Sequence, residues 1–162
     1  MSAMDAIQKL GLGFAWQDLT VGQRFRTFRR TITEADLVNF LGATGMLEAI
    51  FIDSTFSDGA IAGRPVPSAL TYCFIEAFIL QSMIQGTGLA LLEIEQKIVA
   101  PVVVGDSVDA VIEITSIKPT SKSGRAVVTS RIDVFKQDNT LVMTYTATRL
   151  LAGRQALAAA SR

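Results

Sequence analysis

The sequence predicts an α+β fold in which an antiparallel sheet wraps around one long buried helix. The first observation is the run 69–84, which is almost free of charge and apolar on every side of a helix. A helix with this pattern is usually buried all round, and this one is shorter than the roughly 20 residues needed to span a bilayer. The second is a series of four segments after residue 88 whose alternation is typical of antiparallel strands with one covered face.

Length and charge favour a small single-domain protein. The chain has 162 residues, which suits one core, and its 15 basic residues balance its 15 acidic residues. A zero net charge argues against nucleic acid or an anionic membrane as a partner. The N-terminus lacks the pattern of a signal peptide, so we expect a cytoplasmic protein.

The absence of histidine excludes several kinds of active site. No Ser-His-Asp triad or Cys-His pair is possible within the chain, and a zinc site with histidine ligands is excluded. The single cysteine, Cys73, is expected to be a buried thiol in a reducing compartment. We expect no metal, and any proton transfer must use a carboxylate, Tyr, Lys, Cys or water.

The N-terminal half alternates between regular and irregular segments. Residues 23–32 read as a strand whose four arginines form either a solvated face or a phosphate-binding edge: Arg24, Arg26, Arg29 and Arg30. Thr33 and Asp36 resemble a capping box, so a short helix is expected over 33–44, ending before Gly45. The stretch 46–62 has no clear period and is expected to be a long functional loop.

The core helix and the strands complete the expected domain. Ser68 is placed at the N-cap of the core helix, after two prolines that fix its entry. The four strands are expected over 89–99, 108–117, 125–135 and 140–151. Their sheet would leave an edge that a second subunit could cover, so a homodimer or a dimer of dimers is expected.

The domain has short extensions at both ends. Residues 1–13 are expected to form an N-terminal arm, and 152–162 a loosely ordered C-terminal tail. The domain itself would occupy 14–151, because no linker or internal repeat interrupts it.

Four local stretches carry a resemblance to a known family. They are 16–23 (WQDLTVGQ), 31–36 (TITEAD), Gly63-Arg64 and 100–106 (APVVVGD). In this order they resemble the MaoC-like dehydratase family, which includes enoyl-CoA hydratases and has the hotdog fold. The resemblance implies a substrate that is an acyl thioester of coenzyme A or of a carrier protein. It implies no cofactor apart from coenzyme A as part of the substrate.

The chain departs from this family where the family has its acid and base. Hydratases of the family carry Gly-Asp-x-Asn-Pro-x-His after the short helix, and the corresponding stretch here is 45–53. Met46 stands at the family aspartate, Glu48 at the asparagine and Phe51 at the histidine. Both usual proton-transfer groups are therefore replaced.

The resemblance places substrate binding at the start of the core helix. Free amides at a helix N-terminus can polarise a thioester carbonyl, and Ser68 and Ala69 occupy that place. Ser68 could also simply cap the helix. Arg64 corresponds to a family arginine, which implies either a contact with the phosphates of coenzyme A or an ion pair with Asp58 or another loop acid.

Three carboxylates are candidates for catalysis. Glu48 lies among apolar loop residues, so a raised pKa suited to general acid or base work is expected. Asp53 is the second candidate. Glu76 is the third, because some hotdog thioesterases resemble this arrangement, and Tyr72 lies four residues before it and could hold it by a hydrogen bond. Glu48 could instead face solvent or pair with an arginine, Asp53 could be structural, and Glu76 could be a satisfied polar group at a subunit interface.

Three functions remain open from the sequence. The first is an enoyl-CoA hydratase or dehydratase in which Glu48 replaces the usual pair. The second is an acyl-CoA thioesterase that uses Glu76 or Glu48. The third is a non-catalytic family member that binds an acyl thioester or a partner.

Overall fold

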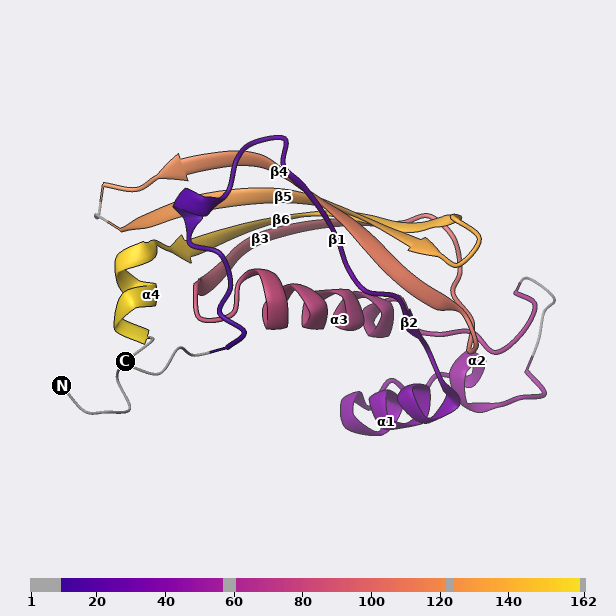
Figure 1. The fold of residues 1–162 in the computed structure, drawn as a ribbon. Helices are drawn as coiled ribbons and strands as arrows, with labels where there is room; N and C mark the ends of the chain where they lie inside the picture. Colours follow the sequence, from indigo (N-terminus) through magenta and orange to yellow (C-terminus); the bar gives the residue numbers. More distant parts are fainter. Residues whose placement is uncertain (1–9, 57–60, 122–123, 161–162) are drawn as a thin grey trace.

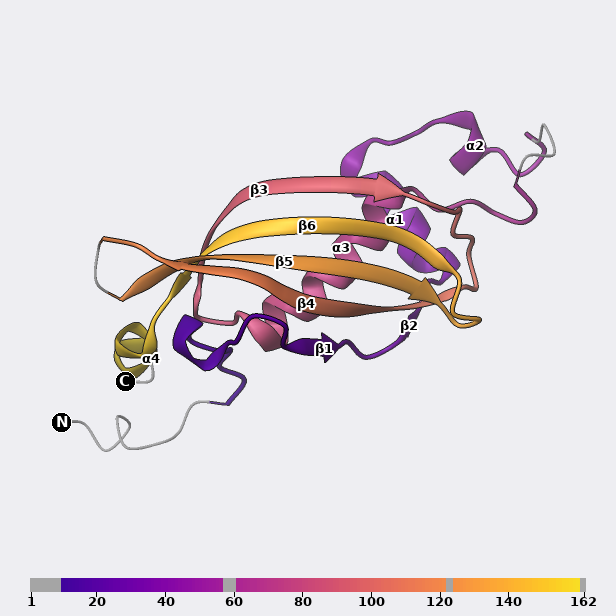
Figure 2. The same ribbon diagram turned by 90° about the horizontal axis from the view of Figure 1, so that it is seen from above.

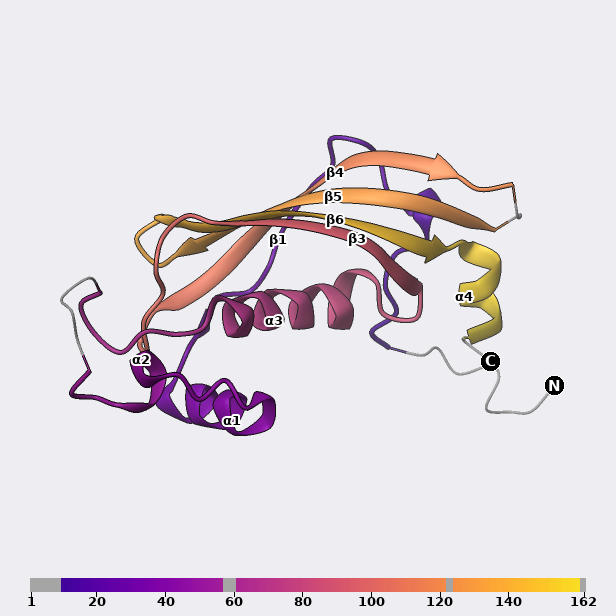
Figure 3. The same cartoon turned by 180° about the vertical axis from the view of Figure 1, so that it is seen from behind.

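The computed structural model describes residues 10–56, 61–121 and 124–160, and its centre is a helix under a curved sheet. The sheet bends over helix α3 (Ser68–Phe78), which lies along its concave face (Figure 1). Helices α1 (Glu34–Thr44) and α2 (Ala49–Ile52) lie at the end of the sheet where α3 begins, whereas α4 (Arg154–Ala160) lies at the other end (Figures 1 and 3). No helix of the described ranges is long and apolar enough to cross a membrane.

One antiparallel sheet contains all the described strands. They are β1 (Arg24–Arg26), β2 (Arg30–Thr31), β3 (Gly88–Ile98), β4 (Ser107–Pro119), β5 (Arg125–Lys136) and β6 (Leu141–Ala152). The strand order is β1-β4-β5-β6-β3, and β2 also pairs with β4. Figure 2 shows β3 at one edge of the sheet. The four strands predicted after residue 88 are all present.

Alternation along β4, β5 and β6 builds the core. On β4 the residues at alternate positions, Val108, Ala110, Ile112 and Ile114, are buried, as their period of two predicts. β5 and β6 contribute matching rows that face α3, including Ile132 and Tyr145, which are paired in register. The core therefore lies between the concave sheet face and α3.

The core helix is not buried all round, which corrects the prediction. Leu70 and Ile75 face the core, but Cys73 and Leu80 are exposed on the described chain. The helix has a sheet on one side only, so its outer side has no cover within the described residues. After Phe78 it continues as the π-helix η3 (Ile79–Met83), within the predicted run.

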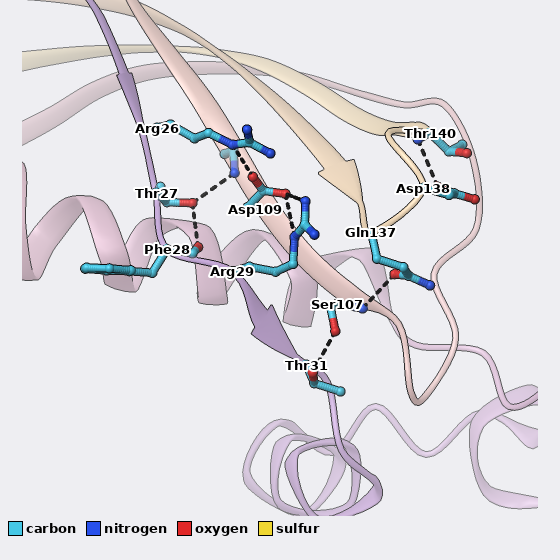
Figure 4. Close-up of polar contacts among 11 residues, drawn as sticks. Arg26, Thr27, Phe28, Arg29, Thr31, Ser107, Asp109, Gln137, Asp138 and Thr140 are labelled. Carbon is cyan, nitrogen blue, oxygen red and sulfur yellow. Dashed lines mark hydrogen bonds and ion pairs between the residues drawn. The ribbon is translucent and has the colours of Figure 1, made fainter.

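Two strands replace the single strand predicted over 23–32. The chain leaves the sheet at 27–29 and returns at β2, and a buried carboxylate anchors this break (Figure 4). Asp109 on β4 accepts hydrogen bonds from Arg26, at 2.5 Å, and from Arg29, at 3.2 Å. Alternation places Asp109 on the outer face, yet the two guanidinium groups cover it, and it is 2% exposed.

The short helix α1 has the ends that the sequence predicts. Thr33 is its N-cap, and Asp36 completes the capping box by accepting from the Thr33 amide at 2.9 Å. Gly45 ends the helix in the left-handed conformation, which glycine adopts at little cost. The following stretch, predicted as an irregular loop, contains the single helical turn α2.

β3 differs from the other long strands because it is exposed on both faces. The prediction of one covered face is wrong for β3, since as the edge strand it pairs only with β6. Its large exposed apolar side chains are Leu89, Leu91, Leu92, Ile94 and Ile98. These side chains form an apolar edge that has no partner within the described chain.

Both terminal extensions are better attached than the sequence suggests. The arm predicted over 1–13 lies outside the described residues up to residue 9, but the Gly13 amide donates to the Gln85 carbonyl at 2.8 Å. The tail predicted to be loosely ordered contains α4, and Arg154 pairs with Asp18 at 2.6 Å.

Candidate functional site

A cavity of about 340 Å³ opens at the N-terminal end of α3. Its walls come from α2, from the entry segment of α3 and from the end of β3 with the turn that follows it. The lining residues are Ile50, Phe51, Ile61, Pro65, Val66, Pro67, Ser68, Ile98, Val99, Ala100, Pro101 and Val102. The lining is almost wholly apolar, and Ser68 is its one polar side chain among the described residues.

The entry to α3 is held rigidly by the turn after β3. Val66 donates to the Val102 carbonyl at 2.9 Å, and Val104 donates to the Arg64 carbonyl at 2.9 Å. Pro65 also forms a bridge with Val103. The stretch 100–106, identified by its resemblance to the family turn, therefore fixes the position of the start of α3.

Asp106 supports this turn from within. Its carboxylate accepts from the Val103 amide at 3.0 Å and from Gln137 at 2.9 Å, and Lys136 lies 3.4 Å away. Burial opposes ionisation, but these hydrogen bonds and the Lys136 charge hold the pKa of Asp106 below its usual value. The turn is therefore tied to the strand pair β4–β5 by an ionised side chain.

Two backbone amides at the start of α3 are free. The helix begins at Ser68, and the first amides bonded within it are those of Leu70 and Thr71, which both donate to the Pro67 carbonyl. Within the described ranges the amides of Ser68 and Ala69 have no partner, as expected at a helix N-terminus. Ser68 lines the cavity, and Ala69 follows it in the first turn of α3.

Ser68 does not cap the helix, contrary to the prediction. The N-cap is Pro67, which has no side-chain hydrogen-bonding group, and Ser68 is the first helical residue. Its exposed side chain lines the cavity instead. Proline in the flanking position adopts an extended conformation that leads the chain into the helix.

Glu48 does not lie in the apolar environment that the sequence predicts. It is exposed, and its Oε2 accepts from the Ile50 amide at 3.3 Å as the N-cap of α2. The apolar neighbours Ile50 and Phe51 turn toward the cavity, whereas Glu48 is not among its lining residues. Phe51, at the position of the family histidine, thus contributes a hydrocarbon wall.

Asp53 organises the loop after α2. Its Oδ1 accepts from the Thr55 amide at 2.8 Å and from the Thr55 hydroxyl at 2.6 Å. The hydroxyl bond and then the amide bond hold the pKa of Asp53 below its usual value. An exposed carboxylate of this kind is a weak base, so the geometry gives it a structural role.

Glu76 is held in a buried ion pair within the chain. Arg149 Nη2 lies 2.6 and 2.7 Å from its two carboxylate oxygens, and the Tyr145 hydroxyl donates to Oε1 at 2.7 Å. Tyr72, expected to hold Glu76, instead packs edge-on against the Tyr145 ring at 5.3 Å. Glu76 does not line the cavity at the start of α3.

The arginines of the N-terminal half are paired with acids. Arg64 Nε lies 2.8 Å from Glu34 Oε1, so its ion-pair partner is at the start of α1 and not in the loop. This contact does not have the geometry of a hydrogen bond. Asp58, the expected partner, lies outside the described residues. The arginines of β1 and β2 also contact carboxylates, namely Glu113, Asp109 and Asp36. These ion pairs favour the prediction that the four arginines form a solvated face over the alternative of a free phosphate-binding edge.

A second, smaller cavity was not anticipated from the sequence. It has a volume of about 50 Å³ and shares six lining residues with the larger cavity, including Ser68. Thr71, Val142 and Met143 line only the smaller one. The spacing of Thr71 three residues after Ser68 could have indicated that both lie on one helix face. No local signal in the sequence brings β6 to this place.

The described residues offer no cluster for a metal ion. In 10–56, 61–121 and 124–160 no group of three or more His, Cys, Asp or Glu side chains comes together. The residues that line the two cavities supply backbone amides, hydroxyl groups and an apolar wall.

Solved structures share this architecture at low sequence identity. A MaoC-like dehydratase from Rhodospirillum rubrum matches 88% of this chain and 99% of its own length, with a TM-score of 0.77 and 22% identity. An R-hydratase from Pseudomonas aeruginosa matches 87% of this chain and 86% of its own length, with a TM-score of 0.71 and 23% identity. A Mycobacterium tuberculosis protein with a double hotdog fold matches 90% of this chain and 46% of its own length, with a TM-score of 0.74 and 15% identity.

The curved antiparallel sheet around one helix is thus the hotdog fold, as the sequence predicted. The family model of the FAS1-like dehydratase domain region matches residues 19–145. The chain belongs to this dehydratase-region family, and it shares the hotdog fold of the MaoC-like structures. No curated protein sequence matches it.

Proposed function

We propose that this protein binds acyl-CoA thioesters, with the thioester carbonyl at the amides of Ser68 and Ala69. The observation that carries the proposal is the pair of unpartnered amides in the first turn of α3, beside an apolar cavity of about 340 Å³ that Ser68 lines. A carbonyl oxygen would satisfy these donors, and the acyl chain would lie against Phe51, Ile98 and Pro101. Ligand sites commonly combine such an apolar lining with a few well-placed polar groups.

The same amides would favour a negatively charged carbonyl oxygen. They stand at the positive end of the α3 dipole and are held by the bridge between Pro65 and Val103. Where such a donor stabilises a transition state, its loss typically costs about 2.7–4 kcal/mol. This contribution uses no side chain, so it survives the replacement of the family aspartate and histidine.

Binding is better supported than proton transfer by this chain alone. The described residues that line the two cavities carry hydroxyl, thioether and hydrocarbon groups and no side chain that titrates near neutral pH. Thioester cleavage through Glu76 is disfavoured, since its carboxylate is occupied by Arg149. The geometry therefore favours an acyl-thioester-binding member of a dehydratase family.

A hydratase or dehydratase is the second candidate. One observation favours it: Glu48 begins the helical turn that carries Ile50 and Phe51 to the cavity. A small rotation of this turn on ligand binding would bring the carboxylate closer to the acyl chain. Mass spectrometry of 2-enoyl-CoA thioesters incubated with the protein tests this. Gain of one water that is lost in Glu48→Gln supports it, and an unchanged panel counts against it.

Substitution at Ser68 tests the binding proposal directly. Ser68→Pro removes one amide donor but suits the first helical position, and Pro67 already has the extended conformation needed before a proline. Ser68→Ala is the matched control, because it removes the hydroxyl and keeps the amide. We expect Ser68→Pro to weaken binding of butyryl-CoA by roughly 3- to 10-fold in calorimetry, and Ser68→Ala to change it little.

Two results would contradict the proposal. One is the absence of heat or thermal stabilisation with any acyl-CoA. The other is equal affinity of the Ser68→Pro protein and the unaltered protein, provided that their circular dichroism spectra agree. Comparing butyryl-CoA with butyryl-pantetheine shows whether the nucleotide part contributes to binding, and Arg64→Ala shows whether Arg64 does.

We also propose that the protein is a homodimer that pairs through β3. This strand presents free backbone groups and apolar side chains on both faces, and Ile98 at its end lines the proposed site. The exposed outer side of α3 and η3, with Cys73 and Leu80, adds apolar surface that lacks cover within the part of the chain that the structure describes. A second copy at β3 would therefore lie close to both cavities.

A further inference from the structure

We infer that the β1 edge of the sheet is a docking surface for an acidic protein segment, with Phe28 as its apolar anchor. The surface consists of Arg24, Arg26, Phe28 and Arg29, none of which lines either cavity. β1 and β3 are the opposite edges of the sheet (Figure 2), so this surface is also separate from the proposed dimer contact. The inference does not depend on thioester binding.

Phe28 is exposed although the backbone that carries it is firmly held. The residue is 85% exposed, and Figure 4 shows its ring pointing away from β4. The Thr27 amide donates to the Ala110 carbonyl at 2.9 Å, and the Thr27 hydroxyl accepts from the Ala110 amide at 2.9 Å. The same hydroxyl donates to the Phe28 carbonyl at 2.9 Å. The base of the ring is therefore fixed before a partner arrives, which lowers the entropic cost of binding.

Arg26 and Arg29 flank Phe28 and are positioned by one carboxylate. The Asp109 side chain that they share is 3% exposed, whereas the two arginine side chains are 59% and 41% exposed. A partner would therefore meet guanidinium groups and not the carboxylate. The hydrogen bond from Arg26 to Asp109 uses only Nε, and the Nη groups of Arg26 make no hydrogen bond within the described ranges. These donors remain available to a partner.

The charges of this surface complement an acidic partner. Its three arginines contact two carboxylates, namely the buried Asp109 and Glu113, which lies 3.9 Å from Arg24. One positive charge is thus in excess. The neighbouring Arg30 is not counted, because it lies over the Phe74 ring at 3.7 Å from the ring centroid. Carboxylates of a partner would form charge-assisted hydrogen bonds with the exposed guanidinium groups.

The backbone of β1 suits a partner segment in an extended conformation. Within the described sheet β1 pairs only with β4. Gln23 accepts from the Ile114 amide at 3.0 Å, and Thr27 donates to Ala110, so alternation leaves the backbone groups of Arg24 and Arg26 on the free side. An added strand would pair with these groups while its carboxylates contact the arginines.

A protein segment fits this surface better than an anionic membrane does. Aromatic residues and arginine are enriched at protein interfaces and among the residues that dominate binding energy. Recognition of anionic lipids typically uses clusters of roughly four to eight basic residues. This surface has three arginines, two of which share Asp109. The chain also has no net positive charge.

The test selects phage-displayed random dodecapeptides on the unaltered protein after depletion on the Phe28→Ala protein. We expect the recovered peptides to be rich in Asp and Glu and to contain an apolar residue. In fluorescence polarisation they should bind Phe28→Ala at least about tenfold more weakly, as the loss of an anchor residue implies. Phe28→Tyr should retain binding. Val38→Ala is the matched control, since Val38 is an exposed apolar residue on α1.

Arg24→Gln tests the electrostatic part. Arg24 is exposed and only distantly paired, so its replacement should not change the melting temperature. It should weaken peptide binding several-fold and make the affinity less sensitive to salt. Phe28→Ala should also leave the melting temperature unchanged, because the ring is exposed. Loss of binding would then report the contact and not unfolding.

Three results would overturn the inference. The first is a selection that yields no peptide able to distinguish the unaltered protein from Phe28→Ala. The second is a set of peptides without acidic enrichment, or with an affinity that Arg24→Gln does not change. The third is binding to vesicles of phosphatidylcholine and phosphatidylserine that is lost in Phe28→Ala, which would assign the surface to a membrane.

Discussion

Arg149 Nη2 on β6 donates to both carboxylate oxygens of Glu76 on α3, at 2.6 and 2.7 Å, and so joins the central helix to the sheet. Both residues are buried, and Tyr145 supplies a third hydrogen bond. Removing one member of a buried ion pair is costly, because the charge of the other member stays buried without a partner and without hydration. The pair therefore holds α3 in register with the sheet, which is a structural role for the carboxylate that the sequence suggested for catalysis.

Glu76→Gln should destabilise the fold without abolishing a specific reaction. Removing the charge leaves Arg149 uncompensated, for which a cost of about 3–5 kcal/mol is expected. Urea unfolding measures it. The double variant Glu76→Leu with Arg149→Met removes both charges and should recover part of the loss. A Glu76→Gln protein as stable as the unaltered one would contradict this assignment.

Asp106 should make the stability depend on pH in acid. Its pKa is lowered in the folded state, so the stabilisation is fully present above the unfolded value of about 3.9 and is lost as the pH falls through the folded value. For the unaltered protein, the urea concentration at the midpoint of unfolding should decrease as the pH is lowered from 6 to 2.5. Asp106→Asn should be less stable at pH 6, and its curve should be flatter, because the ionisable group is gone. Parallel curves for both proteins would exclude this explanation.

Gly13 and Gly42 should respond to alanine in opposite directions. A Cβ at Gly13 would lie 2.5 Å from the Met83 carbonyl oxygen, whereas a Cβ at Gly42 in α1 would meet nothing within 4 Å. Gly13→Ala should therefore cost about 1–3 kcal/mol through forced backbone movement. Gly42→Ala should stabilise by roughly 0.5–1 kcal/mol through the better helix propensity of alanine. Thermal unfolding measures both effects. Melting temperatures that shift in the same direction for the two variants would refute the packing of residue 13 against the end of η3.

Leu91→Arg should weaken the proposed dimer. Leu91 lies on the exposed β3 edge, and a charge there would oppose pairing with a second copy. Phe28→Arg is the control, because Phe28 is also exposed but lies between β1 and β2, away from β3. Sedimentation velocity should show a dimer for the unaltered protein and the control, and mostly monomer for Leu91→Arg. A monomeric unaltered protein would remove the basis of the proposal.

The fold could be predicted because its signals are local and repeated. Period-two alternation gave the strands of β4, β5 and β6, and Thr33 with Gly45 marked the ends of α1. The exposure of Cys73 was missed, since an apolar helix looks the same whether its outer side meets its own chain or another subunit. The covering of Asp109 was missed because it depends on arginines some eighty positions earlier.

The candidate site was predictable only where backbone geometry decides it. The amides of Ser68 and Ala69 follow from the start of a helix, and the helix was evident from its composition. The surroundings of Glu48 were misjudged, because an apolar sequence neighbourhood does not mean an apolar spatial one. Glu48 shows this, since its neighbours turn inward and it turns to solvent. Thr71 was missed, since its free hydroxyl is visible only when its hydrogen bonds are known.

The two prolines before α3 have a consequence for how a ligand orients itself. Pro65 and Pro67 carry no N–H, and the amide of Val66 between them is already bonded to Val102. Along 65–67 the backbone amide donors are thus either missing or occupied. An incoming oxygen atom that approaches along this entry segment first meets free amide donors at Ser68 and Ala69, and the absence of competing amides at 65–67 orients the molecule attached to it.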